Sequence, residues 1–276
     1  MRKLVFILIA YCLPLVVNAQ KADMRISELI NTSNWFALEK EYPLLKDSIQ
    51  YDFVGLMAEA MIAQNFNKEK EAIGMFRTLI NSHQQQIGSG AALSFAEMAL
   101  GNYERCGMYR LAADKANGLI DQIKTSGVPI DYTKLLDIHK RNKALSKYDS
   151  TIVIHRNTKD VIVPFTMNNS DVLFDKQTPV SNRYYIPVTI HGVAYQFMFD
   201  TGATTTSLSK RLADRIGVEY IDYSSPYGSL AYLDSMQLGD VTFKNVIALV
   251  HNGTPLDSIC NIDAVLGMDL VRQLDE

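Results

Sequence analysis

The chain has 276 residues, of which 47% are hydrophobic and 21% charged, and its formal net charge is −3 at pH 7. This composition is typical of a globular protein with one large or two modest domains, and it excludes a wholly disordered chain. Basic residues are not concentrated in any segment, so we expect no nucleic-acid partner.

Residues 1–19 have the pattern of a secretory signal peptide. Arg2 and Lys3 form a basic head, an apolar stretch follows, and Val17-Asn18-Ala19 offers a small-residue cleavage site. The apolar stretch is too short for a membrane anchor, and no later segment is apolar enough to span a bilayer. The sequence therefore predicts a protein exported by the secretory pathway, periplasmic or extracellular, with no membrane span.

Residues 20–147 are predicted to form a helical domain. Apolar residues recur at helical spacing in the stretches 53–66, 70–80, 93–103 and 109–123, and the connections are short. A weak internal repeat makes this domain loosely similar to tetratricopeptide-type arrays of paired antiparallel helices. Two interpretations stay open: a plain helical domain that packs on its neighbour, or a groove that binds a peptide or protein partner.

Residues 148–276 change to period-two alternation and β-forming residues. Strands are predicted at 151–156, 160–167, 184–190, 193–199, 229–238 and 241–250. Tight turns are expected at His191-Gly192 and Gly239-Asp240, and one short helix at 210–217 is expected to be capped by Ser209. The predicted fold class is α+β with two domains, an N-terminal α-hairpin array followed by a mostly β domain.

One motif in the β half stands out. The apolar end of the strand predicted at 193–199 leads directly into Asp200-Thr201-Gly202-Ala203. Further along, Val265-Leu266-Gly267 precedes Asp269, which we expect to cap the last helix. This order resembles the retropepsin-like aspartic proteases, in particular the bacterial single-lobe type, over roughly residues 161–276.

The resemblance implies a retropepsin-like fold and an aspartic-type endopeptidase activity on polypeptide substrates. In this chemistry two carboxylates share one proton, so that one activates a water and the other protonates the scissile peptide. Because the sequence holds one Asp-Thr-Gly, the resemblance implies a homodimer in which each subunit supplies its own aspartate. The roles that it implies are a catalytic Asp200, an active-site loop (Thr201, Gly202, Ala203), an apolar-glycine support (Val265, Leu266, Gly267) and a candidate flap (Tyr227, Gly228, Ser229).

The C-terminus departs from the family pattern. Retropepsins add an interface strand after the last helix, whereas this sequence ends at Glu276. We therefore expect a truncated C-terminus, interface strands taken from 151–156 and 160–167, or a loss of the family's dimer.

Alternatives to catalysis stay open. Asp200 can cap a turn through local N–H groups, and a degenerate protease fold can serve as a non-catalytic peptide-binding or adapter protein. The histidines of the β half lack metal-site spacing, so we expect neither a metal nor a cofactor.

Overall fold

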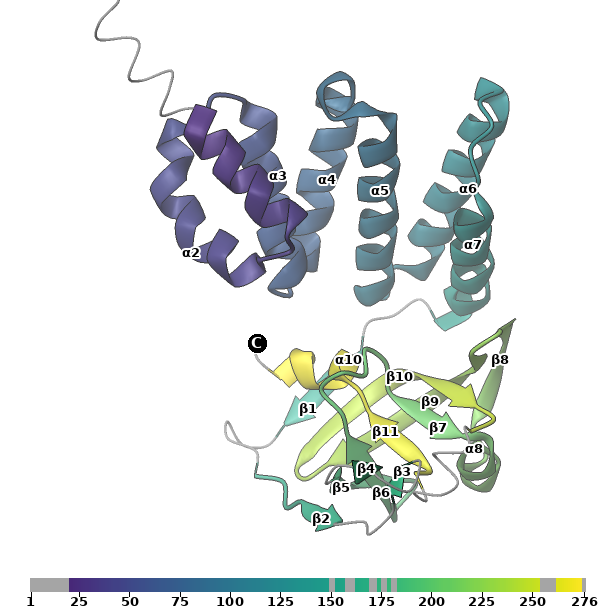
Figure 1. The fold of residues 1–276 in the computed structure, drawn as a ribbon. Coiled ribbons are helices and arrows are strands. Elements are labelled where there is room, and N and C mark those ends of the chain that lie inside the picture. The colour runs from purple at the N-terminus through teal and green to yellow at the C-terminus, as the bar shows by residue number, and fades with distance from the viewer. Residues whose placement is uncertain are drawn as a thin grey trace, which may run out of the picture. The chain divides into compact units, whose positions relative to one another are not determined.

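The computed structural model describes residues 20–148, 152–156, 162–168, 173–174, 178–179, 183–253 and 262–274. The chain forms two compact units, Met1–His139 and Lys140–Glu276. The first is helical and the second is mostly β (Figure 1), which confirms the predicted α+β class. The signal peptide predicted at 1–19 lies outside the described residues.

Paired helices build the first unit. Each of the helices α2 to α5 contacts the next one along the chain, and they lie side by side in Figure 1. Their similarity to tetratricopeptide repeats stays a prediction. The helical elements are a helix at 20–31, α2 (Trp35–Leu45), η1 (Lys46–Ser48), α3 (Asp52–Asn65), α4 (Glu69–Ser82), α5 (Gln84–Arg105), α6 (Tyr109–Ser126), α7 (Thr133–Leu145) and η2 (Ser146–Tyr148).

Apolar side chains join these helices. Phe76 of α4 stacks on Phe95 of α5 with ring centroids 5.4 Å apart, and both rings are buried. A second cluster contains Leu100 of α5, Ile120 of α6 and Leu135 of α7. Helical amphipathicity thus holds the array together, as the spacing of apolar residues predicted.

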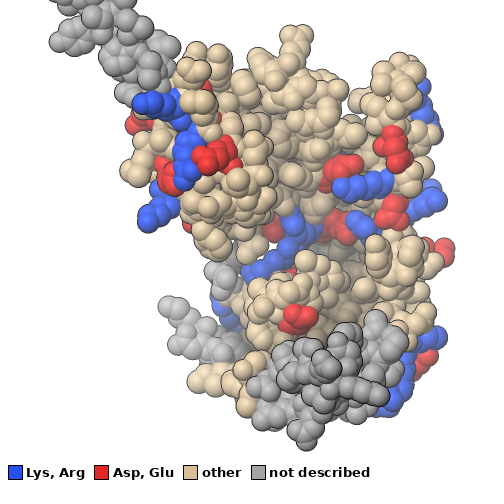
Figure 2. All heavy atoms as spheres, viewed as in Figure 1, with Lys and Arg blue, Asp and Glu red and all other residues tan. Residues whose placement is uncertain are grey.

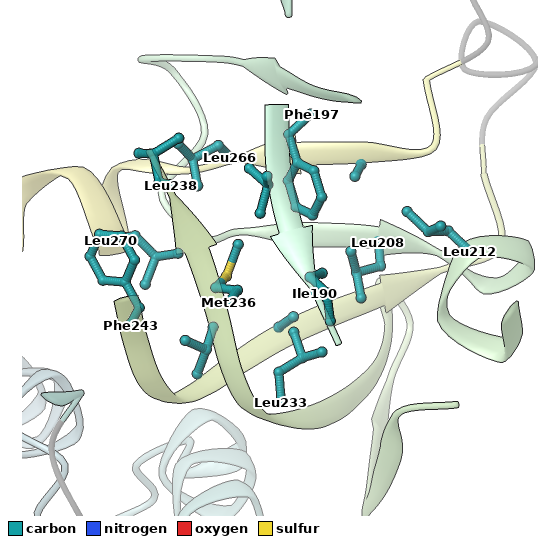
Figure 3. Close-up of a cluster of buried hydrophobic side chains, with 14 of the residues drawn as sticks. Ile190, Phe197, Leu208, Leu212, Leu233, Met236, Leu238, Phe243, Leu266 and Leu270 are labelled. Atoms are coloured by element: carbon teal, nitrogen blue, oxygen red, sulfur yellow. The ribbon is translucent and has the colours of Figure 1, made fainter. Parts of the chain in front are cut away.

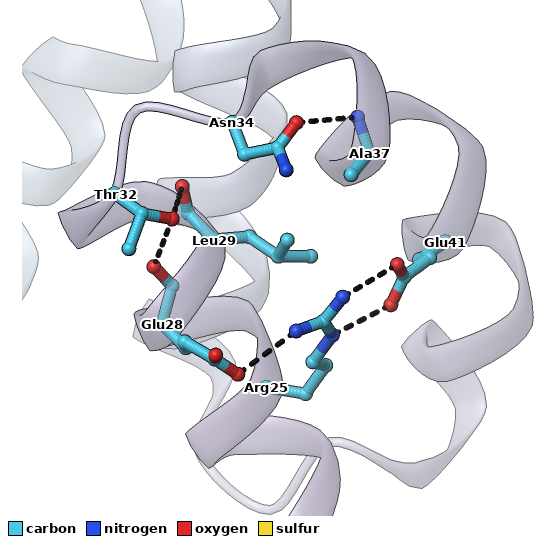
Figure 4. A network of polar contacts seen from close by, with 7 residues as sticks. All are labelled: Arg25, Glu28, Leu29, Thr32, Asn34, Ala37 and Glu41. Carbon is cyan, nitrogen blue, oxygen red and sulfur yellow. Dashed lines mark hydrogen bonds and ion pairs between the residues drawn. The ribbon is translucent and has the colours of Figure 1, made fainter.

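A polar network ties the helix at 20–31 to α2. The Arg25 guanidinium donates to both carboxylate oxygens of Glu41 at 2.8 Å and to Glu28 at 2.9 Å (Figure 4). These groups are partly exposed, so solvent weakens the pairs and they serve mainly to orient the two helices. On the face shown in Figure 2, basic and acidic side chains of the described residues lie interspersed on the helical unit. None of the described helices combines the length and apolarity needed to cross a membrane.

The strands of the second unit close into a ring. Pairing runs in the order β10-β7-β11-β6-β5-β9, and β9 then pairs with β10 again. The pairs β10–β7 and β11–β6 are parallel, and the other pairs of the ring are antiparallel. The elements are β1 (Val153–Arg156), β2 (Thr166–Asn168), β3 (Leu173–Phe174), β4 (Thr178–Pro179), β5 (Arg183–Ile190), β6 (Val193–Phe199), β7 (Ser207–Ser209), α8 (Lys210–Ile216), β8 (Glu219–Ser225), β9 (Gly228–Leu238), β10 (Val241–His251), β11 (Ala264–Leu266), α10 (Met268–Val271) and η3 (Arg272–Leu274).

Local sequence explains several of these elements. His191 and Gly192 both have positive φ, at 50° and 76°, as a two-residue turn between β5 and β6 requires. The Ser209 hydroxyl accepts a hydrogen bond from the Leu212 amide at the start of α8, and the helix ends at left-handed Gly217. The predicted turns and helix are therefore confirmed.

Two strand predictions need correction. The strand predicted at 160–167 is reduced to β2 (Thr166–Asn168) within the described residues, since 162–165 include Pro164, which cannot donate to a ladder. Strand β8 (Glu219–Ser225) was not among the predicted strands, and it pairs with β9. The predicted strand at 151–156 appears as β1, which pairs with β10 of the same chain.

The interior of the ring is apolar. Phe197 of β6, Leu208 of β7 and Leu266 of β11 are fully or almost fully buried and enter one cluster, shown in Figure 3. Leu270 of α10 joins the same cluster. The strands that flank the Asp200 loop are thus anchored in the core.

We expect Phe197→Ala to lower the free energy of unfolding by about 3–5 kcal/mol, because it removes a fully buried ring and leaves a cavity. Val193→Ala on the same strand is the matched control, since Val193 is 52% exposed and its truncation should cost less than about 0.5 kcal/mol. Urea denaturation followed by circular dichroism measures both. Equal losses of unfolding free energy in the two variants would contradict the placement of Phe197 in the core.

Candidate active site

Strand β6 delivers Asp200 to a tight loop. The Gly202 amide donates to Asp200 Oδ1 at 2.8 Å, and the Ala203 amide donates to the Asp200 carbonyl at 3.2 Å. A Cβ on Gly202 would lie 3.2 Å from Asp200 Oδ1, so glycine permits this close approach. The loop therefore presents a half-buried carboxylate next to exposed Thr201 and Gly202.

The carboxylate of Asp200 is only partly used by the loop. Its Oδ1 accepts the bond from Gly202, as the turn-capping alternative requires. Among the described residues no hydrogen bond engages Oδ2. One oxygen is thus fixed in orientation, and the other can bind a water or a substrate.

Strand β11 supports the loop from the side. Leu266 pairs with Phe199 in parallel register, and the Leu266 carbonyl accepts a hydrogen bond from the Asp200 amide at 3.3 Å. The Met268 amide donates to the Ala203 carbonyl at 2.8 Å. The structure therefore brings Val265, Leu266 and Gly267 against the Asp200 loop.

Gly267 allows the two chain segments to touch. A Cβ at this position would lie 2.5 Å from the Thr205 carbonyl carbon and 2.7 Å from the Thr206 nitrogen. Both obstacles are backbone atoms, which cannot rotate away. Glycine is required here by close approach, and its φ of −90° is open to any residue.

A buried polar network lies behind the loop. Thr206 is fully buried, and its amide and hydroxyl donate to Asp269 Oδ1 at 2.9 and 2.8 Å. The Thr206 hydroxyl oxygen accepts from the Gly267 amide at 3.2 Å. Burial raises the pKa of Asp269 above its ordinary value, although the hydrogen bonds from Thr206 act in the opposite direction.

Asp269 does not cap the last helix, although the sequence had led us to expect it. The cap position of α10 is Gly267, and no side chain caps this helix. The Asp269 carboxylate reaches across to Thr206 because α10 follows Gly267 directly and faces the segment after the loop. Sequence reasoning missed Thr206, and the run of threonines at 204–206 beside a later aspartate is the signal that pointed to it.

A second carboxylate holds the other end of β11. Asp263 Oδ1 accepts from the Ser209 hydroxyl at 2.9 Å and from Arg211 Nη2 at 2.7 Å. Burial opposes ionisation of Asp263, but the hydrogen bonds from Arg211 and Ser209 keep its pKa below the ordinary value. Strand β11 is therefore fixed at both ends, which limits movement of the loop that it supports.

The candidate flap residues lie at the tip of the β8–β9 hairpin. Tyr227 is 81% exposed in the turn, and Gly228 begins β9 with φ of 144°. A Cβ on Gly228 would lie 2.2 Å from the Val250 carbonyl oxygen of β10. Gly228 therefore allows the hairpin to rest on β10, and the role of Tyr227, Gly228 and Ser229 as a flap stays a prediction.

Part of the β-unit is similar to known proteins. Residues 186–270 match the family described as aspartyl protease. A retropepsin-like aspartic protease from Rickettsia conorii is 23% identical, with 41% of this chain and 82% of that chain covered and a TM-score of 0.29. The retroviral protease-like domain of Ddi1 from Leishmania major is 20% identical, with 32% and 74% covered and a TM-score of 0.22. No curated protein matches this chain.

We expect Gly267→Ala to destabilise the β-unit by about 1–3 kcal/mol, because the added methyl overlaps the backbone of Thr205 and Thr206. Gly118→Ala on the exposed face of α6 is the matched control, where a Cβ meets nothing within 4 Å. There the same change should stabilise by up to about 1 kcal/mol. Urea denaturation distinguishes the two, and a neutral Gly267→Ala would contradict the close approach.

Stability should depend on pH through Asp269. A raised pKa in the folded state means that its stabilising contribution is present below the ordinary carboxyl pKa and is lost as pH rises through the raised value. Asp269→Asn stays neutral and keeps an oxygen acceptor for Thr206. Its unfolding free energy relative to the wild type should therefore increase between about pH 4 and about pH 7.

Asp214→Asn is the control for this pH dependence. Hydrogen bonds from Lys210 and Tyr220 lower the pKa of Asp214, so its contribution is present above the ordinary pKa and is lost as pH falls. Urea denaturation at the two pH values should show the increase for Asp269→Asn and a nearly constant unfolding free energy, relative to the wild type, for Asp214→Asn. The same trend in both would contradict the burial of Asp269.

The geometry of the Asp200 loop, its support by β11 and the match over residues 186–270 all lie within the second unit. Residues 186–270 of this unit match the aspartyl protease family, and a helical region precedes them in the chain.

Proposed function

We propose that this chain is an exported aspartic endopeptidase that hydrolyses polypeptides as a homodimer. The family match supports an aspartic protease function for the β-unit. The observation that carries the finer proposal is the Asp200 loop, where one carboxylate oxygen is oriented by the Gly202 amide and the other has no partner among the described residues. A rigid, accessible carboxylate is what a water-activating group requires.

Catalysis needs a second carboxylate beside the first. Two adjacent carboxylates do not ionise together readily, so the pair keeps one proton and can act as base and acid at once. The base takes a proton from a bound water, which attacks the peptide carbonyl, while the acid protonates the carbonyl oxygen and the nitrogen then leaves with a proton. Their titration belongs to the pair.

Symmetry supplies the second carboxylate. The sequence has one Asp-Thr-Gly, and a twofold axis beside the exposed Thr201-Gly202 edge would bring Asp200 of two subunits together. Thr201 would then bond across the axis, as the family resemblance implies. The tip of the β8–β9 hairpin would act as the flap over a bound peptide.

The sequence at 1–19 supports export through the secretory pathway to the periplasm or beyond. The helical unit would recruit a substrate or a protein partner. Edman sequencing of the protein recovered from the exported fraction tests this part: a mature chain beginning at Gln20 supports it, and an intact Met1 in the cell interior contradicts it.

Asp200→Asn should abolish cleavage of a mixed peptide library between roughly pH 3 and 7, because the amide cannot serve as base in the shared-proton pair. Asp234→Asn is the matched control. This carboxylate is exposed on β9, bonds to the His191 ring, and its loss should leave cleavage unchanged. Cleavage by the Asp200→Asn variant would contradict the proposal. An absence of cleavage by the wild type would favour a non-catalytic adapter.

Mixing subunits tests the homodimer. If each site needs both aspartates, an equal mixture of wild-type and Asp200→Asn chains should retain about a quarter of the activity per total dimer after exchange. Retention of about half of the activity would show that each subunit acts independently, and about three quarters would show that one Asp200 suffices in a shared site, so either result would contradict the proposal.

A further inference from the structure

Arg183 is a buried cation that has no partner among the described residues. It is 8% exposed, and its Nε and Nη1 atoms are enclosed and donate no hydrogen bond. No ion pair involves Arg183 within the part of the chain that the structure describes. A guanidinium stays charged in proteins and carries five donors, so its burial without an acceptor is costly.

The position of Arg183 relates it to the candidate site. It is the first residue of β5, and β5 pairs with β6 in an antiparallel register that sets Tyr185 opposite Met198. Two further steps along this register lead to Arg183 on one strand and Asp200 on the other. The two residues therefore lie at the same end of the β5–β6 ladder.

The Arg183 side chain lies on the face of β5 opposite to the core residues Ile186, Val188 and Ile190. Arg183 and Tyr185 are both buried, whereas Tyr184 between them is 44% exposed and contacts Phe165 on the other face. Because strand side chains alternate, Arg183 lies on the face of β5 that also carries Tyr185, and it is buried outside the apolar core. Its charge must be met by a group that comes from outside the described chain.

We propose that Arg183 is a specificity-determining residue that binds a carboxylate of the peptide substrate beside the Asp200 loop. This inference rests on the proposed peptidase function and adds a substrate class, peptides with an acidic side chain or terminal carboxylate near the scissile bond. A carboxylate can accept a charge-assisted hydrogen bond from the guanidinium. The substrate carboxylate would relieve the cost of a charge that has no partner among the described residues.

Peptide binding to the inactive Asp200→Asn chain is the first test. Pairs of fluorescent peptides carry Glu or Gln at each position in turn, and anisotropy gives their affinities. We expect the Glu peptide to bind at least roughly tenfold more tightly at one position, as for a hydrogen-bonded charge pair. Adding Arg183→Gln should reduce that ratio to about one and leave the Gln peptide unchanged, while Arg215→Gln, an exposed arginine of α8, should keep it.

Thermal stability tests whether the residue is structural. Arg183→Met removes the unpaired charge and retains an apolar stem, so the free variant should melt at the wild-type temperature or up to a few degrees above it. A melting temperature lowered by several degrees would show an internal partner and would overturn the proposal.

The outcomes separate this inference from the protease proposal. A preference for the Glu peptide in binding, without any cleavage by the wild type, would support the substrate-binding role of Arg183. The same result would contradict the proposed peptidase function. Cleavage with no Glu-over-Gln difference at any position would support the peptidase and overturn the role of Arg183. If Arg183→Gln weakened the dimer in sedimentation and left peptide preference intact, the carboxylate would come from a second copy, which also overturns it.

Discussion

The hydrogen bond from the Asp200 amide to the Leu266 carbonyl joins two segments that are distant in sequence and sets the geometry of the whole site. It extends the parallel pairing of β6 with β11, and β11 in turn pairs with β7, the strand that leaves the loop. The strands before and after Asp200 are therefore held apart by β11. The loop between them has little freedom left, and a catalytic carboxylate gains orientation from this restraint.

Polar groups placed behind the loop reinforce that restraint. Thr206 and Asp269 are largely enclosed, and a partly satisfied pair in such a place would cost stability. Here the Thr206 hydroxyl both donates to Asp269 and accepts from the Gly267 amide, so that it links both segments of the site. Arg183 differs from this network, because its donors have no acceptor among the described residues. The contrast separates polar groups that build the site from one suited to a ligand.

Features with local causes were predictable from the sequence. The turn at His191-Gly192, the capped helix α8 and the apolar strands β5 and β6 each follow from residues that are neighbours in the chain. The motif around Asp200 and the apolar-glycine segment located the site because both are short and distinctive.

Features that depend on distant contacts were not predictable in the same way. The reach of Asp269 to Thr206 spans 63 positions and left no periodic signal, so a helix cap was the simpler expectation. The length of β2 depends on its pairing with β5, and the existence of β8 depends on its pairing with β9. From the sequence alone, Arg183 is an ordinary charged residue at the start of a strand. Its burial and its lack of partners among the described residues are seen only in the structure.

The late position of β11 in the chain has a consequence for biogenesis. Strands β6 and β7 are made early in the β-unit, yet the strand that separates them is supplied by residues 264–266. Contacts between such distant segments form slowly, since a long loop must be closed first. A ribosome that has completed the Asp200 motif therefore still carries an unformed site. The order of synthesis delays the assembly of this site until nearly all of the described chain exists.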